Sequence, residues 1–294
     1  MKIIDCVTYF DESMLLEVRM NILNKFVDIF LVIEAQHTHS GKKKKLNFNI
    51  NNYPSFKNKI IYLVINDEPE GIIFDKYLSS SQKRLNSLKR IDQSYNKAID
   101  YLKNCNPDDI FILSDIDEIP NLEKINFEKI NSKFIFFKQK MFYYKFNLYY
   151  DLISWFGSKA CRIRNLILPS ILRHTKTKKY PFWRIDTWFS KVKYSSVKII
   201  ENGGWHFTNL KSPEKILEKY LNFGHHNEYE DISVKLEDIQ KMISEKSVGY
   251  NHLADQKQKN KISVNSYKLK KISINQLPNF ICDHQDRYKE FIEN

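Results

Sequence analysis

The chain has 294 residues, 42% of them hydrophobic and 14% aromatic, which is enough for one large domain or two small ones with a sizeable core. It has only seven glycines and neither a G-x-G-x-x-G nor a G-x-x-x-x-G-K-[ST] motif, which excludes the two common glycine-rich phosphate cradles. The formal net charge of +12 favours anionic partners such as nucleotides, nucleic acid or lipid headgroups, although solubility explains such an excess equally well.

Two further features concern the compartment. The four cysteines are far apart and form no C-x-x-C motif, which is typical of thiols in a reducing compartment. The first apolar run is too short for a signal peptide, and no window approaches the ~20 apolar residues of a membrane span. We therefore expect a cytoplasmic protein, either free or peripheral at the inner face of a membrane.

The first 120 residues alternate between strand and helix patterns. Residues 2–10 predict a strand, Asp11 is a plausible N-cap, and a helical apolar spacing follows up to Phe26. The continuous apolar runs 27–35, 58–66 and 110–114 predict strands buried on both faces, and residues 79–104 have helical spacing. This order predicts an α/β nucleotide-binding layout, in which ligands lie beyond the carboxyl ends of the strands.

After Pro120 the sequence becomes aromatic and β-prone, which predicts an antiparallel half where an acceptor could stack on exposed rings. Ser212 is expected to cap a helix that starts at Pro213, and a second helix is expected over about 234–247. We predict one catalytic domain over residues 1–254, with a nucleotide-binding half (1–120) and an acceptor-side half (121–254). A basic C-terminal extension, residues 255–294, is expected to pack on it.

The stretch "ILSDIDEIP" places Asp115, Asp117 and Glu118 directly after the fourth predicted strand. Three crowded carboxylates favour a nearby cation, and Mg²⁺ or Mn²⁺ prefers carboxylate oxygen. A lone D-x-D also occurs in solvated turns, so both interpretations stay open. In "ENGGWHFTN", the pair Gly203–Gly204 predicts close backbone approach or positive φ. His206 is a candidate metal ligand or a structural hydrogen-bonding residue.

The stretches "IIDCVTYFDESMLLEVRMNIL", "FLVIEAQHTHSGKKKKLNF", "PDDIFILSDIDEIP" and "IENGGWHFTNL" resemble successive landmarks of glycosyltransferase family 17. The resemblance implies a GT-A fold, a mixed sheet flanked by helices, with Mn²⁺ or Mg²⁺ and a nucleotide-sugar donor such as UDP-N-acetylglucosamine. It implies metal binding by Asp115, Asp117 and His206. The donor-binding residues that we predict are Thr8, Glu34, Thr38, Gly41, Asp115 and Trp205.

One position departs from the family's pattern. Relatives tend to have "QRN" in the helix before the D-x-D strand, whereas this chain has "QSYN" at residues 93–96. We expect Arg84 or Arg90 to supply any phosphate contact that the missing arginine would make.

The expected reaction is sugar transfer, with inversion, to a hydroxyl group of a glycan or lipid-linked glycan acceptor. Inversion requires a general base. Asp186 is the first candidate, because flanking tryptophans could raise its pKa, and Glu118 and Glu201 are rivals. A salt bridge from Asp186 to Arg184 or a lysine is an equally good interpretation.

Two other functions fit parts of the sequence. A haloacid-dehalogenase-like phosphatase would use Asp115 as a nucleophile. A non-enzymatic nucleic-acid-binding protein would stack bases on "KQKMFYYKF", residues 138–146.

Overall fold

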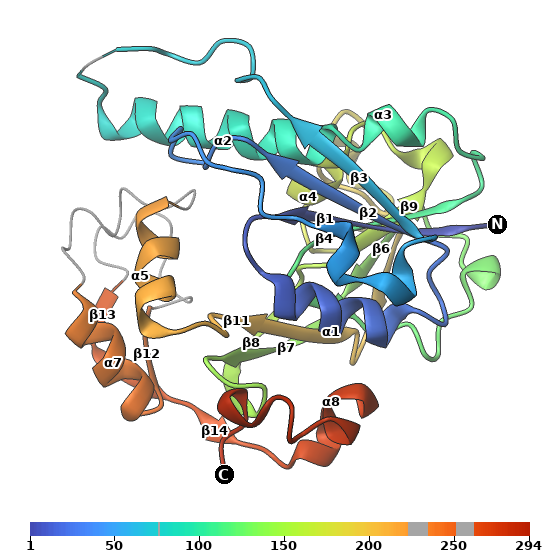
Figure 1. The fold of residues 1–294 in the computed structure, drawn as a ribbon. Coiled ribbons are helices and arrows are strands. Elements are labelled where there is room, and N and C mark those ends of the chain that lie inside the picture. The colour runs from blue at the N-terminus through green and yellow to red at the C-terminus, as the bar shows by residue number, and fades with distance from the viewer. Residues whose placement is uncertain (76, 223–234, 251–261) are drawn as a thin grey trace.

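The computed structural model describes residues 1–75, 77–222, 235–250 and 262–294, and its centre is a seven-stranded mixed sheet (Figure 1). Four parallel strands form one side of this sheet in the order β3-β2-β1-β4. They are β1 (Ile3–Tyr9), β2 (Ile29–Ala35), β3 (Ile60–Ile65) and β4 (Ile110–Asp115). The strand predicted over residues 2–10 and the three predicted from continuous apolar runs are therefore confirmed, and their carboxyl ends lie at one edge of the sheet.

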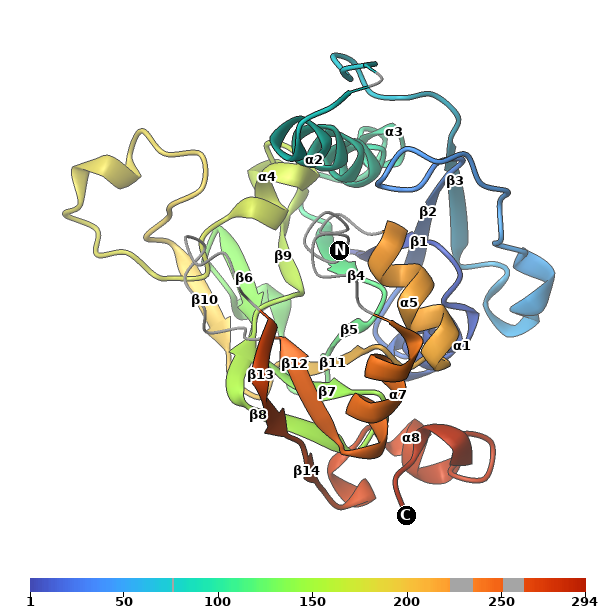
Figure 2. The ribbon, with the colours of Figure 1, turned by 90° about the vertical axis from the view of Figure 1, so that its left-hand side faces the viewer.

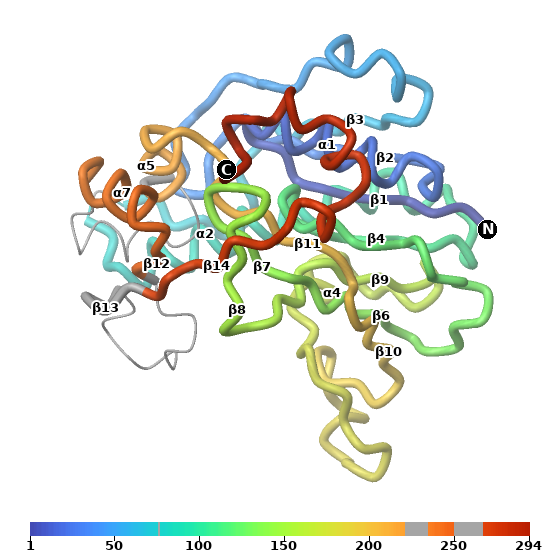
Figure 3. The backbone as a smooth tube through the Cα atoms, turned by 90° about the horizontal axis from the view of Figure 1, so that it is seen from below, coloured from blue at the N-terminus to red at the C-terminus, as the bar shows by residue number. Residues whose placement is uncertain are grey.

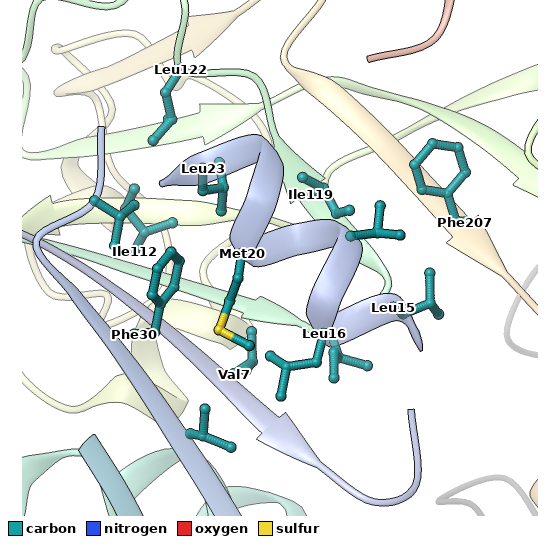
Figure 4. Close-up of a cluster of buried hydrophobic side chains, with 14 of the residues drawn as sticks. Val7, Leu15, Leu16, Met20, Leu23, Phe30, Ile112, Ile119, Leu122 and Phe207 are labelled. Carbon is teal, nitrogen blue, oxygen red and sulfur yellow. The ribbon is translucent and has the colours of Figure 1, made fainter. Parts of the chain in front are cut away.

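Helices cover both faces of the sheet. Helix α1 (Ser13–Leu23) packs its apolar side on one face, where Met20 lies against Val7 and Phe30 (Figure 4). The other face is covered by three helices, α2 (Ser80–Asn96), α3 (Ile99–Leu102) and α4 (Pro169–His174). Ser79 caps α2 in a reciprocal capping box, as its hydroxyl oxygen accepts from the Gln82 N–H group. The predicted N-cap at Asp11 is wrong, because α1 begins one residue later, after Glu12.

The aromatic second half adds to two sheets. Three strands extend the large sheet beyond β4 in the order β9-β6-β10, namely β6 (Phe134–Phe137), β9 (Lys159–Arg162) and β10 (Val197–Ile200). A five-stranded sheet has the order β14-β8-β7-β11-β5. Its members are β5 (Glu118–Pro120), β7 (Gln139–Tyr143), β8 (Leu148–Trp155), β11 (Gly204–Thr208) and β14 (Lys270–Lys271). The pairs β6–β10 and β7–β11 are parallel, so the prediction of an antiparallel half is only partly right.

The C-terminal part returns to the body of the molecule. Helix α5 (Pro213–Asn222) begins after Ser212, whose hydroxyl oxygen accepts from the Lys215 N–H group at 3.4 Å, as predicted. Helix α7 (Leu236–Ser244) and the hairpin of β12 (Ser247–Tyr250) and β13 (Ile262–Lys268) follow. Strand β14 pairs with β8, and α8 (Asn279–Asp283) packs against α1. Residues 255–261 of the predicted extension lie outside the described residues.

Short 3₁₀ helices complete the architecture, at Ile50–Asn52, Pro54–Phe56, Phe127–Lys129, Ile163–Asn165, Ile185–Thr187, Ile274–Gln276 and Lys289–Phe291. None of the helices in the described ranges is both long and apolar enough to span a membrane.

The aromatic side chains fall into two groups. The rings of the segment 134–150 are mostly core, including Phe142, Tyr143, Tyr144 and Phe146. Buried rings cannot stack on bases, so "KQKMFYYKF" is not a nucleic-acid-binding surface. The second group lies on residues 175–196, between α4 and β10. These residues, which we call the projecting loop, stand out from the body of the molecule (Figures 2 and 3).

Candidate active site

The three carboxylates lie in the turn from β4 to β5, residues 115–118, which we call the acidic turn. Asp115 is the last residue of β4 and lies opposite Thr8 of β1 in the register of the parallel sheet. The acidic turn therefore lies at the carboxyl edge of the parallel strands, where the strand order predicted a ligand site.

A guanidinium group forms ion pairs with two of these crowded carboxylates. Arg173 of α4 donates to Asp115 Oδ2 at 2.7 Å and to both Glu118 carboxylate oxygens at 2.7 and 2.9 Å. Tyr95 donates its hydroxyl to Asp115 Oδ1 at 2.9 Å, and Trp155 donates its indole N–H to Glu118 Oε1 at 2.6 Å. Burial alone would raise the pKa of Glu118, but the charge and hydrogen bonds of Arg173, together with His206, lower that pKa. Burial raises the pKa of Asp115 to about 6, against the opposing effect of Arg173.

Asp117 has a different environment. Its carboxylate oxygens lie 3.6 Å from His206 Nε2 and 3.6 Å from Lys219 Nζ of α5. Burial would raise the pKa of Asp117, but its interactions with His206 and Lys219 hold that pKa well below its usual range. The His206 ring stacks on Trp155 with centroids 4.9 Å apart, and its Nδ1 atom is buried without a hydrogen-bond partner in the described part of the chain. Asp117 is thus ionised and loosely held.

A fully buried arginine holds the backbone of the acidic turn. Arg19 of α1 donates to both carboxylate oxygens of Asp5 in β1, at 2.6 and 2.7 Å. It also donates to the carbonyl oxygens of Glu118, at 2.7 Å, and Asp115, at 3.4 Å. Helix α1 therefore holds the backbone of the acidic turn in position through Arg19.

Three glycines allow the surrounding strands to approach closely. A Cβ atom at Gly157 would overlap the Glu118 carboxylate. A Cβ atom at Gly203 would come within 2.7 Å of backbone atoms, and Gly204 has φ 130° and lies against the backbone of β5. The predicted close approach and positive φ at Gly203–Gly204 are confirmed. This contact aligns His206 of β11 with Glu118 of β5.

The fit of a divalent metal ion depends on the two aspartates. Among the described residues, no three His, Cys, Asp or Glu side chains converge into a ready-made metal site. Asp115 and Asp117 nevertheless offer hard oxygen donors: 32% of the Asp115 side-chain surface is exposed, and the 3.6 Å contacts of Asp117 are longer than hydrogen bonds. Mg²⁺ and Mn²⁺ commonly take one or two carboxylates and complete their shell with substrate phosphates and water. The donor set therefore fits such an ion.

Three of the residues predicted to bind the donor have local structural partners. Glu34 is buried at the end of β2, and its carboxylate accepts from Lys44, Tyr62 and the backbone of residues 47 and 48. Thr38 Oγ1 accepts from the Lys42 N–H group at 3.1 Å in the turn that follows. Gly41, with φ 94°, closes the same turn.

The other residues predicted to contact the donor have different surroundings. The Arg90 guanidinium lies against Gly41 and pairs with Glu68, Nε to Oε2, at 2.7 Å. Trp205 packs against the main hydrophobic core. Its neighbour in β11, His206, lies opposite Glu118 of the acidic turn. Of the predicted donor-binding residues outside the acidic turn, only Thr8 lies opposite Asp115 in the sheet register.

The structure separates the three candidate general bases. Asp186 lies on the projecting loop and is paired with Arg184 and Lys193 at 2.8 and 2.9 Å. Hydrogen bonds from these two side chains lower its pKa to about 2, so the expectation that aromatic neighbours raise this pKa is wrong. Glu201 is exposed in the turn before β11 and pairs with Lys138 at 2.9 Å. Only Glu118 lies in the acidic turn, and both of its oxygens already accept from Arg173.

Several residues of this site were not identified from the sequence. Arg173 and Lys219 lie in ordinary polar helix segments, and neither carries a local signal. Tyr95 and Trp155 are likewise single aromatic residues among many. Gly157 is different, because the chain has only seven glycines, and a glycine in a β-rich segment is typical of a point of close contact.

A buried lysine supports Arg173 from the neighbouring strand. Lys159 of β9 donates to the Arg173 and Thr175 carbonyl oxygens, each at 2.6 Å, and so satisfies the carboxyl end of α4. Burial, followed by the Arg173 charge, lowers the pKa of Lys159 to about 7.

Because the unfolded chain holds this proton more tightly than the folded one, Lys159 should favour folding increasingly as the pH rises from about 7 to about 10. The free energy of unfolding of the wild type, minus that of Lys159→Met, is expected to grow by up to about 1.4 kcal/mol per pH unit there. Urea titrations at several pH values measure this difference. A difference that is constant across the range would contradict the lowered pKa.

The model of glycosyltransferase family 17 matches residues 1–293. The β-1,4-mannosyl-glycoprotein 4-β-N-acetylglucosaminyltransferases of Homo sapiens and Rattus norvegicus are each 28% identical to the chain over 133 residues. These matches cover 44% of the chain and only about a quarter, 24% and 23%, of the two relatives.

Among solved structures, HddC from Yersinia pseudotuberculosis aligns with 69% of the chain and 91% of its own length, at 10% identity and a TM-score of 0.35. That likeness is too weak to support an argument about function. The family match, by contrast, extends over nearly the whole sequence and includes every element of the acidic turn. The chain belongs to glycosyltransferase family 17.

Proposed function

We propose that this protein is a metal-dependent glycosyltransferase. It transfers a sugar, N-acetylglucosamine from UDP-N-acetylglucosamine, to a hydroxyl group of a glycan or glycolipid acceptor, with inversion at the anomeric carbon. The observation that carries this proposal is the family match over residues 1–293. The relatives named above supply the choice of sugar, and the geometry of the acidic turn supplies the choice of site.

Asp115 and Asp117 are the proposed metal ligands, and the divalent ion would supply neutralisation of the charge on the departing nucleotide diphosphate. Arg173 keeps Glu118 and Asp115 in place as a fixed, hydrogen-bonded pair. Lys219, at the edge of the same site, adds a positive charge within reach of a diphosphate. These fixed charges need no rearrangement when the sugar bond breaks, which is the economical arrangement for stabilising a developing anion.

The geometry also bears on the rival enzyme. A phosphatase nucleophile requires a carboxylate oxygen that is free for in-line attack. Both Asp115 oxygens already accept hydrogen bonds, one from Tyr95 and the other from Arg173. These hydrogen bonds, one of them from a guanidinium, weaken Asp115 as a nucleophile, whereas a metal ligand can keep them because each carboxylate oxygen has two lone pairs.

Calorimetric titration of nucleotide sugars tests the donor and the metal together. We expect UDP-N-acetylglucosamine to bind when Mn²⁺ is present and to lose most of its affinity in EDTA, because the diphosphate then meets unscreened carboxylates. GDP-mannose serves as the control for the nucleotide. Binding that is unchanged in EDTA would refute the metal, and equal binding of both donors would refute the choice of nucleotide.

A further inference from the structure

The projecting loop exposes an unusual set of apolar side chains. Five of them are between 66% and 85% exposed: Phe182, Trp183, Ile185, Trp188 and Phe189. All five lie within the eight consecutive positions 182–189, and the loop that carries them stands away from the rest of the molecule (Figures 2 and 3). A cluster of large exposed apolar residues on a soluble protein marks a surface that meets something apolar.

The loop has a defined shape that keeps these rings outside. Its two arms are joined by backbone hydrogen bonds from Lys176 to Val192, at 2.7 Å, and from Tyr180 to Tyr194, at 3.2 Å. Within the tip, Asp186 pairs with Arg184 and Lys193. These charged groups at the tip therefore pair with one another at the surface, and the rings beside them face solvent. The loop is held by its own hydrogen bonds and ion pairs, and this ordered backbone keeps the apolar side chains exposed.

Positive charge surrounds the apolar tip. Between residues 176 and 193 the chain has six basic side chains, Lys176, Lys178, Lys179, Arg184, Lys191 and Lys193, against the single acidic Asp186. Basic residues beside exposed tryptophan and phenylalanine are the combination that binds anionic membrane surfaces: the rings enter the headgroup region and the lysines meet the lipid phosphates. A neutral glycan would need the rings but not the excess charge.

We propose that the projecting loop is a membrane anchor that inserts its aromatic tip into an anionic lipid bilayer. The occupant is a bilayer containing acidic phospholipid, chosen because both its charge and its apolar interior complement the loop. The inference rests on the loop alone and is independent of the proposed sugar transfer. It names a segment for peripheral membrane binding, a property that net charge alone could not assign to any region.

Vesicle sedimentation tests the anchor. The wild-type chain is expected to sediment with vesicles of equal parts phosphatidylcholine and phosphatidylglycerol, and at least about tenfold less with phosphatidylcholine alone or in high salt. The variant Trp188→Ser/Phe189→Ser should lose at least about tenfold in partitioning to the acidic vesicles. The matched control is Phe74→Ser/Tyr77→Ser, which removes two side chains that are 80% and 81% exposed on another loop and should bind as the wild type does.

Depth of insertion is a second and more specific readout. The chain has four tryptophans, two of them on the loop, so vesicles with brominated acyl chains should quench a large part of the fluorescence. Trp183→Phe/Trp188→Phe should keep vesicle binding but lose that quenching, because phenylalanine preserves the apolar contact.

Four results would overturn the proposal. The first is no sedimentation of folded wild type with acidic vesicles. The second is equal binding by the serine variant. The third is binding without quenching. The fourth is a dimer in analytical ultracentrifugation that the serine variant abolishes, which would identify a second copy of the chain as the occupant.

Discussion

Replacing Asp117 by asparagine is expected to lower the rate of sugar transfer roughly 100- to 1,000-fold while the protein stays folded. Asp117 is the carboxylate of the acidic turn that has no hydrogen bond from Arg173, and its oxygens lie 3.6 Å from His206 and Lys219. The amide keeps the shape of the side chain but removes the negative charge that a divalent ion would need. The measurement is the initial rate of transfer from UDP-N-acetylglucosamine with Mn²⁺ present.

Two controls make this result interpretable. Asp100→Asn removes an equally charged but exposed carboxylate on α3, which pairs with Lys97, and should leave the rate unchanged. Thermal unfolding of both variants separates a lost charge from a lost fold. Calorimetric binding of Mn²⁺ adds a readout that does not depend on the choice of donor. A full transfer rate or undiminished Mn²⁺ affinity in Asp117→Asn would remove Asp117 from the metal site.

Replacing Arg19 by methionine is expected to lower the free energy of unfolding by about 3–5 kcal/mol. The substitution leaves the carboxylate of Asp5 buried without its bidentate partner, and that carboxylate is 1% exposed. An uncompensated buried charge is among the most damaging changes a core can undergo. Urea unfolding at constant pH measures the loss.

A double substitution distinguishes the ion pair from the support of the acidic turn. Asp5→Leu/Arg19→Met removes both charges and should recover much of the lost stability, since apolar replacements of a buried pair are often neutral. Its transfer rate should stay low, because the Glu118 and Asp115 carbonyl oxygens still lack the guanidinium. As a control, Arg287→Met breaks an exposed ion pair between Arg287 and Glu17 of α1. It should lower the free energy of unfolding by less than about 1 kcal/mol. A double variant as unstable as the sum of its singles would contradict this account.

The parallel half of the fold could be predicted because its signals are local. Each of β2 to β4 is a short apolar run with polar flanks, and burial on both faces requires such a run. The second half was harder, since which strand pairs with which depends on long connections. Nothing within β6 or β10 indicates that they are parallel neighbours, because 59 residues separate Phe137 from Val197.

The acidic turn could likewise be predicted, but its partners could not. Like charges at residues 115, 117 and 118 required nearby cations, and the sequence interpretation supplied a metal ion. The structure supplies Arg173 and Lys219, which lie 58 and 102 positions away from Asp115 and Asp117. Tertiary contacts of that separation leave no trace in local composition. For Asp186 the error was local, because the neighbouring arginine decided its pKa more strongly than the tryptophans.

Gly157 shows how one missing methyl group limits the evolution of this chain. The residue lies in the short connection between β8 and β9, a setting where most amino acids are freely exchanged. Its backbone does not need the left-handed region, but the space beside its Cα is filled by the carboxylate that Arg173 grips. Even alanine there would compete with a charged group for the same volume. The geometry of the acidic turn therefore requires glycine at position 157, nearly forty positions after Glu118 in the sequence.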